Sequence, residues 1–273
     1  MTKPKTDRYY ADEDWDVDSW VDVIAVEYET LVRAFPFGRV LQSLSGSGSL
    51  RVLDVGCGTA IFPGYLDAIL PPDVRLIADL FDVSEPSLRR ARDVLEQLPH
   101  FSVGRTYQAL IEDLPTTLPV EIDLYDVIWA IHSFTTVNVA PMGAVYSRLL
   151  EALRPGGYLF VYQLTSESYY QKFHGLYRSE HPHGRNTAPY MEFEDSQKIL
   201  ESLGVDYEVY PQRFAHEIAE NRVDLLEKYL QKVILDDTVD VGELFGPLLE
   251  GVYDSARERY VIPQSVNLIT VCK

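Results

Sequence analysis

A short predicted strand followed by a glycine loop is the segment of this chain whose residue types point most clearly to chemistry. The apolar run over residues 50–55 ends in Gly56, Cys57 and Gly58. Glycines at these positions allow the backbone to turn sharply and to approach a ligand closely. Asp82 ends the next predicted strand, where nucleotide-binding α/β proteins place an acid that binds ribose hydroxyls. This spacing predicts a site for a cofactor that contains a nucleoside.

Two classes of cofactor could bind such a loop, and the neighbouring residues distinguish between them. A dinucleotide-binding loop needs a third glycine or alanine where the pyrophosphate meets a helix N-terminus, and this chain has Ile61 there. An acid, Asp54, precedes the loop. S-adenosylmethionine (SAM) carries no phosphate, and its amino and sulfonium groups are cationic, so an acidic loop does not repel it. The residues therefore favour SAM over a nicotinamide dinucleotide.

The same segment resembles the cofactor loop of class I SAM-dependent methyltransferases. The resemblance continues through residues 82–87, 111–115 and 153–158. It implies an α/β, Rossmann-like class I methyltransferase fold with a mostly parallel seven-stranded sheet, a helical N-terminal cap and SAM as the cofactor. Where many members have an acid, this chain has Leu110, so backbone contact from Ile111 would replace it. The resemblance implies a cofactor site formed by Asp54, Gly56, Cys57, Gly58, Asp82, Val83, Ile111, Glu112 and His132.

A finer resemblance supplies candidates for the catalytic site. The order of predicted elements is similar to that of histamine N-methyltransferase and its relatives, which implies that Glu27 binds the substrate. His132 stands where those relatives have a glutamine, and Gln264 where they have an asparagine, which implies a different substrate. His132 also directly follows a predicted strand, where a neutral histidine can accept a proton from an attacking nitrogen or oxygen. Asn138 and Tyr177 are further candidates for contacts near the reacting centre.

Around these residues the sequence predicts three regions. Residues 1–45 form a helical N-terminal cap, residues 46–165 the SAM-binding core, and residues 166–273 a substrate-side insert with the closing strands of the sheet. In the core, predicted strands alternate with helices, which is typical of a parallel sheet with right-handed crossovers.

The charge and composition of the chain limit the classes of substrate and partner that we expect. Forty-two acidic residues against 24 basic ones give a net charge of −18. This charge repels a polyanion, so we expect a small-molecule substrate and no nucleic acid. No apolar run reaches membrane-spanning length and the first residues contain no apolar signal core, which predicts a cytoplasmic protein without a membrane partner. The oligomeric state does not follow from the sequence.

The cysteines and histidines do not form a recognisable metal-binding pattern. Cys57 and Cys272 are not expected to form a structural disulfide. His174, His181 and His183 lie close together in the sequence, but they lack acid or cysteine partners at the spacing of a metal site. We therefore predict no metal.

Methyl transfer from SAM is an in-line displacement, so the enzyme has chiefly to align the acceptor and exclude water. We predict methyl transfer to the amine or hydroxyl of a small molecule, which His132 and Glu27 orient or deprotonate. The chain also resembles, less specifically, the SAM cyclases that form azetidine-2-carboxylate and methylthioadenosine. In that alternative the aromatic N-terminus, with Tyr9, Tyr10 and Trp15, closes a lid over SAM. A SAM-binding module without turnover is the second alternative.

Overall fold

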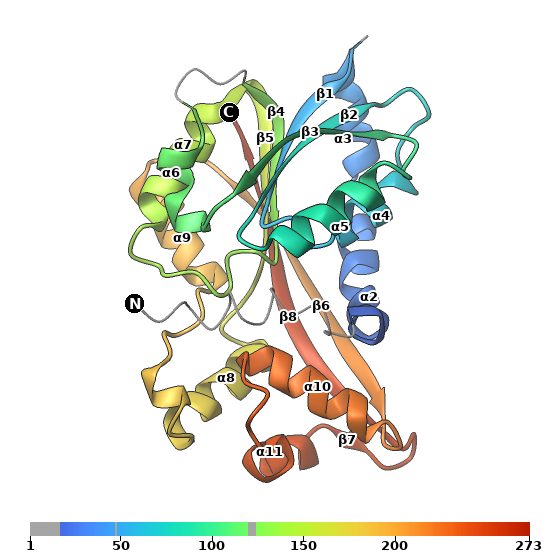
Figure 1. Cartoon of the computed structure of the whole chain (residues 1–273), viewed down its shortest axis with the longest axis vertical. Helices are drawn as coiled ribbons and strands as arrows, with labels where there is room; N and C mark the ends of the chain where they lie inside the picture. Colours follow the sequence, from blue (N-terminus) through green and yellow to red (C-terminus); the bar gives the residue numbers. More distant parts are fainter. Residues whose placement is uncertain (1–16, 47, 120–123) are drawn as a thin grey trace.

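The structure is a computed structural model that describes residues 17–46, 48–119 and 124–273. It is built on a mostly parallel β-sheet (Figure 1). Within these residues the sheet has eight strands in the order β3-β2-β1-β4-β5-β8-β6, and the two-residue β7 pairs with β8 beside this path. Neighbours from β3 to β5 are parallel, and β8 is antiparallel to both β5 and β6. The predicted α/β class and Rossmann-like sheet are confirmed. The strands are β1 (Leu50–Val55), β2 (Leu76–Asp82), β3 (Phe101–Gln108), β4 (Tyr125–Ile131), β5 (Leu153–Leu164), β6 (Glu208–Ala219), β7 (Tyr253–Asp254) and β8 (Arg259–Cys272).

Helices cover both faces of this sheet, because successive side chains of each strand point to opposite faces. Val52 and Trp129 belong to one hydrophobic core, whereas their neighbours Leu53 and Ile128 belong to the other. Figure 1 shows the first face under α3, α4 and α5 and the second under α6, α7 and α9. These helices are α3 (Phe37–Ser45), α4 (Ile61–Asp67), α5 (Glu85–Leu95), α6 (Leu114–Thr117), α7 (Met142–Ala152) and α9 (Phe193–Ser202).

A further group of helices lies beyond the carboxyl ends of the parallel strands. It consists of α8 (Tyr169–Glu180), α10 (Val223–Ile234) and α11 (Val241–Glu250), which share a third hydrophobic core. Two single turns, η1 (Ile111–Asp113) and η2 (Gly184–Asn186), complete the described elements. No helix in the described ranges combines the length and apolarity needed to cross a membrane.

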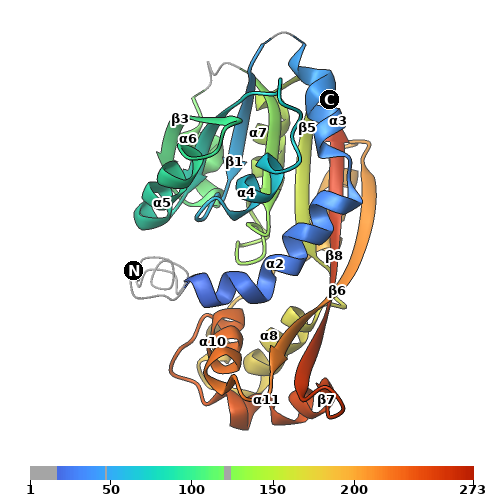
Figure 2. The same cartoon turned by 90° about the vertical axis from the view of Figure 1, so that its right-hand side faces the viewer.

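Helix α2 (Val17–Ala34) lies between the sheet and this lower group, as Figure 2 shows. Its residues Ile24, Tyr28 and Leu31 join the core on one face of the sheet, whereas Val23 joins the core of the lower group. The helix is therefore buried on two sides, and this places Glu27 between the two layers. The predicted division into cap, core and insert stays a prediction.

The buried Asp79 ties four strands of the sheet together. The residue lies on β2 and is 1% exposed. Its carboxylate accepts hydrogen bonds from the Arg51 side chain on β1 (3.0 Å), the Arg105 backbone N–H on β3 (2.7 Å) and the Tyr125 hydroxyl on β4 (2.8 Å). Since β2 also ends in Asp82, this link helps to position the cofactor loop.

Replacing Asp79 with alanine should destabilise the fold by about 3–5 kcal/mol, because it leaves a partly buried guanidinium and two further donors without their acceptor. Urea unfolding followed by circular dichroism measures the change. Asp73→Ala, at an exposed position, is the matched control and should change stability by no more than about 0.5 kcal/mol. Equal stability of the two variants would contradict this account.

Candidate active site

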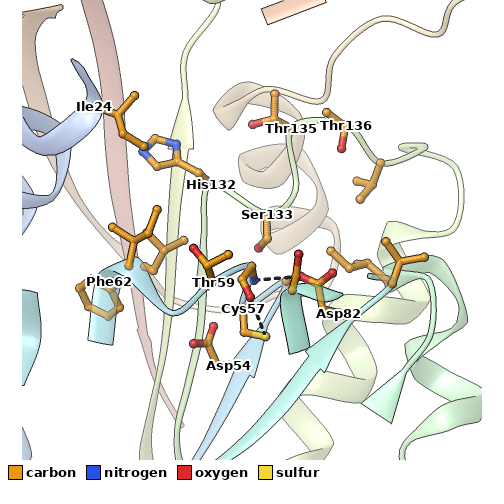
Figure 3. A pocket seen from close by; sticks show the side chains of 18 of the residues that line it. Ile24, Asp54, Cys57, Thr59, Phe62, Asp82, His132, Ser133, Thr135 and Thr136 are labelled. Carbon is orange, nitrogen blue, oxygen red and sulfur yellow. Dashed lines mark hydrogen bonds between the residues drawn. The ribbon is translucent and has the colours of Figure 1, made fainter. Parts of the chain in front are cut away.

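A cavity of about 670 Å³ lies where the carboxyl ends of the strands face α2, α8 and α10. Its volume is within the range of about 300–1,000 Å³ that is typical of small-molecule sites. Figure 3 shows His132, Ser133, Asp82 and the Cys57–Thr59 loop among the residues around it. Of the residues singled out in the sequence, those that line the cavity are Glu27, Asp54, Gly56, Cys57, Gly58, Asp82, Val83, Ile111, Glu112 and His132.

The glycine loop forms one end of the cavity. Gly56 has a φ of +67°, and a Cβ atom there would lie 2.3 Å from the Cβ of Ser133, so a larger residue would collide with the loop after β4. The N–H of Gly58 donates a hydrogen bond to one oxygen of Asp82 (2.9 Å), and the N–H of Ser84 donates to the other (2.8 Å). The Asp82 carboxylate is thus held in place, and lone pairs remain on its oxygens for ribose hydroxyls.

Two buried acids make this end suitable for a cation. Burial raises the pKa of Asp54 to about 7, and burial also raises the pKa of Asp82 against the hydrogen bonds that Ser84 and Gly58 donate. A cationic group beside Asp54 would favour the ionised carboxylate. Together, a backbone cradle that a Cβ would fill, a positioned carboxylate and a buried acid fit the adenosine and methionyl parts of SAM.

Glu112 stabilises the part of the cavity wall that η1 and the loop after β4 form. Its carboxylate accepts a hydrogen bond from the backbone N–H of Asn138 (2.9 Å), which links η1 to the loop after β4. The side-chain oxygen of Asn138 accepts from the N–H of Ala140 (3.1 Å), within the same loop. Asn138 is not among the residues that line the cavity, so its predicted contact with the reacting centre finds no support in this geometry.

Glu27 forms the centre of the opposite end. Its carboxylate lies 2.6 Å from Nε2 of His132 and 2.7 Å from Nε2 of His216, and the hydroxyl of Tyr170 donates to it at 3.4 Å. The residue is 2% exposed. Burial by itself raises the pKa of this carboxyl group, but the two imidazoles outweigh that effect and hold the pKa well below its ordinary value. Glu27 is therefore ionised between two histidines.

The backbone of His132 has a conformation that non-glycine residues seldom adopt. Its φ is +58°, and its N–H donates to the carbonyl oxygen of Tyr162 at the end of β5 (2.9 Å). Such strain is typical of functional positions. Because Nε2 faces Glu27, a neutral ring carries its proton there and keeps the lone pair on Nδ1. Since His132 lines the cavity, this lone pair is available to a bound acceptor.

Behind Glu27, a chain of hydrogen bonds fixes the second histidine. Nδ1 of His216 lies 2.9 Å from the hydroxyl of Tyr229, and the side-chain amide of Gln264 donates to that hydroxyl at 3.1 Å. The hydroxyl of Ser168 donates to the carbonyl oxygen of Gln264. The Tyr229 hydroxyl thus links Gln264 to His216. Gln264, predicted near the substrate, instead reaches Glu27 through this chain.

Tyr177 is also placed differently from the prediction. It is buried outside the cavity, and its hydroxyl donates to Asp236 (2.6 Å). The candidate lid residues Tyr9, Tyr10 and Trp15 lie outside the described residues.

The sequence reasoning missed several residues of the site. These are Tyr170 on α8, His216 on β6 and Lys232 on α10. Burial lowers the pKa of Lys232 to about 7. The signal for His216 was present, because His216 and Ile218 alternate with exposed neighbours and a histidine at an inward strand position needs a polar partner.

Comparison with known proteins agrees with this geometry. The sequence profile of a methyltransferase domain matches residues 52–157. A protein of Bacillus halodurans assigned as a methyltransferase shares 17% identity over 86% of this chain and 97% of its own, with a TM-score of 0.57. The YcgJ protein of Bacillus subtilis shares 13% identity over the same fractions, with a TM-score of 0.55. No curated protein sequence matches the chain significantly.

A third solved structure, a SAM-dependent methyltransferase of Leishmania major, shares 16% identity over 78% of this chain and 75% of its own, with a TM-score of 0.51. At these identities the solved structures show the fold, which is that of class I SAM-dependent methyltransferases. Residues 52–157 thus form a methyltransferase domain on this fold, which supports a SAM-dependent transferase with SAM as its cofactor.

SAM should bind more tightly as the pH rises through about 7, because Asp54 must lose its proton to stabilise the cationic cofactor. With a pKa of about 7, the affinity at about pH 6 should be roughly tenfold lower than at about pH 8. Isothermal titration calorimetry measures both values. Asp54→Asn should bind SAM more weakly at the higher pH and lose most of this dependence, whereas Asp73→Asn should retain it. An unchanged pH dependence in Asp54→Asn would refute the role of Asp54.

Proposed function

We propose that this SAM-dependent transferase moves the methyl group of SAM to the amine or hydroxyl of a small molecule, with His132 as the general base. The observation that carries the proposal is the buried carboxylate of Glu27, 2.6 Å from the His132 ring. The same cavity contains the glycine loop, so His132 and the cofactor site face one shared space.

The proton movement follows from the arrangement of the two histidines around Glu27. The acceptor nitrogen or oxygen attacks the methyl carbon while its proton passes to Nδ1 of His132. The Glu27 carboxylate, 2.6 Å from Nε2, stabilises the imidazolium that forms, as an acid does beside a catalytic histidine. When bound, SAM supplies the methyl group on a sulfonium. The acceptor gains the C–N or C–O bond, the C–S bond breaks, and S-adenosylhomocysteine leaves.

The extent of the cavity supports an external acceptor over cyclisation of SAM. Beyond the glycine loop and His132, the cavity continues to Tyr170, Val233 and Leu235. A cyclase has to enclose only the folded methionyl part of SAM and needs no such space. Asn138 and Tyr177, the polar residues predicted near the reacting centre, do not line the cavity.

Mass spectrometry of the purified protein with SAM tests the proposal. With SAM alone we expect intact SAM. With a panel of small amines and alcohols we expect S-adenosylhomocysteine together with one methylated acceptor. Methylthioadenosine and a four-membered cyclic amino acid, formed without any acceptor, would establish the cyclase reaction instead. SAM that stays intact with every acceptor would favour the binding module.

Replacing His132 should slow turnover much more than it weakens SAM binding. We choose His132→Asn because asparagine tolerates a positive φ. Loss of a general base typically lowers kcat about 10²–10⁴-fold, and Glu27→Gln should also lower kcat because it removes the charge that stabilises the imidazolium. Steady-state kinetics and SAM calorimetry separate the two effects.

The matched control is His100→Asn, which removes another histidine paired with a carboxylate, Asp67 at 3.0 Å, outside the cavity. It should leave kcat within about twofold of wild type, a change of less than roughly 0.5 kcal/mol in the barrier. Wild-type turnover in His132→Asn would exclude His132 as the base.

A further inference from the structure

Three side chains of metal-binding type meet outside the cavity, where the segments that follow α8 and α10 come together. His181 and His183 follow α8, and Asp236 follows α10. One ligand atom of each residue lies within 4.8 Å of those of the other two. Nδ1 of His183 is 3.1 Å from a carboxylate oxygen of Asp236. The sequence prediction of no metal rested on the lack of an acid partner for these histidines, and the fold supplies that partner from 53 residues away.

The carboxylate of Asp236 is already oriented by outer partners. The residue is 6% exposed. One oxygen accepts hydrogen bonds from the backbone N–H (3.1 Å) and the hydroxyl (2.6 Å) of Thr238. The other accepts from the hydroxyl of Tyr177 (2.6 Å) and faces His183. Outer hydrogen bonds of this kind hold ligands in place at metal sites.

The two imidazoles face the same small volume. The His181 ring stacks on the ring of Tyr177, with centroids 5.4 Å apart, and meets the His183 ring edge-on at 4.9 Å. The backbone N–H of His183 donates to Nδ1 of His181 at 3.3 Å, a long hydrogen bond that a small rotation of the ring would break. The aromatic stack therefore keeps His181 beside the other two ligands.

The donor set indicates which ion would bind. Two imidazoles and one carboxylate suit Zn²⁺ and neighbouring transition metals, whereas Mg²⁺ and Ca²⁺ prefer oxygen ligands alone. Bonds of about 2.0–2.2 Å from a zinc ion place adjacent ligand atoms a little over 3 Å apart. The separation of His183 and Asp236, 3.1 Å, agrees with this geometry.

We propose that His181, His183 and Asp236 bind one Zn²⁺ ion that joins the end of α8 to the end of α10. Water would complete the coordination. Val233 and Leu235, at the end of α10, line the cavity, so the ion would steady the wall that faces the acceptor. The hydroxyl of Tyr190, another cavity residue, donates to the carbonyl oxygen of Val233 and adds a second link to that wall. The site stands apart from the proposed methyl transfer and does not depend on it.

Zinc binding to the purified chain tests the proposal directly. After treatment with a chelator, the protein is titrated with Zn²⁺ in competition with a chromophoric chelator, and its thermal midpoint is measured with Zn²⁺ or Mg²⁺. We expect one tightly bound Zn²⁺ per chain and a higher midpoint with Zn²⁺ than with Mg²⁺.

His181→Asn and His183→Asn are the test variants. The His183 side chain is 57% exposed, so its replacement should not unfold the protein. Each variant should bind Zn²⁺ at least about 100-fold more weakly, because loss of even an outer partner costs about 10–100-fold. His100→Asn, which removes a histidine paired with a carboxylate elsewhere, should bind like wild type. Absence of stoichiometric Zn²⁺ binding to wild type would overturn the proposal, as would equal affinities of His183→Asn and His100→Asn.

Discussion

The close contacts of the Glu27 carboxylate with two histidines are the interaction on which the active site depends. An isolated buried carboxylate costs several kcal/mol, so a lone Glu27 would disfavour the seating of α2 on the sheet. His132 at the end of β4 and His216 on β6 place their Nε2 atoms 2.6 and 2.7 Å from the carboxylate and so compensate for its burial. The N-terminal helix, the parallel core and the antiparallel edge of the sheet are thereby coupled through one side chain. The contacts that hold these layers together also place the His132 ring where it can act as a base.

Two buried carboxylates, at opposite ends of the cavity, have pKa values shifted in opposite directions by their different surroundings. Burial, with the nearby Asp82, raises the pKa of Asp54 to about 7, so a cation is favoured beside it. Glu27 is buried against two imidazoles, which hold its pKa well below the ordinary value and keep it charged. Opposite shifts of this kind separate the roles of acids within one site. The first acid suits cofactor binding, and the second suits orientation of a base.

The residues predicted for the cofactor end line one cavity, because its glycine turn and the Asp82 carboxylate are set by neighbouring strands. The acceptor end depends on long-range pairing, which the sequence shows less clearly. Pairing with β8 extends β6 to Ala219 and so brings in His216. Gln264 was predicted near the substrate and lies one layer further out, behind Tyr229. The partnership of Asp236 with His183 likewise exists only in the folded chain.

The protonation state of His132 tests the central claim most directly. Long-range ¹⁵N–¹H NMR of protein labelled on histidine reports which ring nitrogens carry protons, and the His132→Asn variant assigns the signal. We expect a proton on Nε2 of His132 and none on Nδ1, and we expect this signal to change in Glu27→Gln. A proton on Nδ1 instead, or on both nitrogens, would leave no lone pair to accept a proton from the acceptor and would contradict the account.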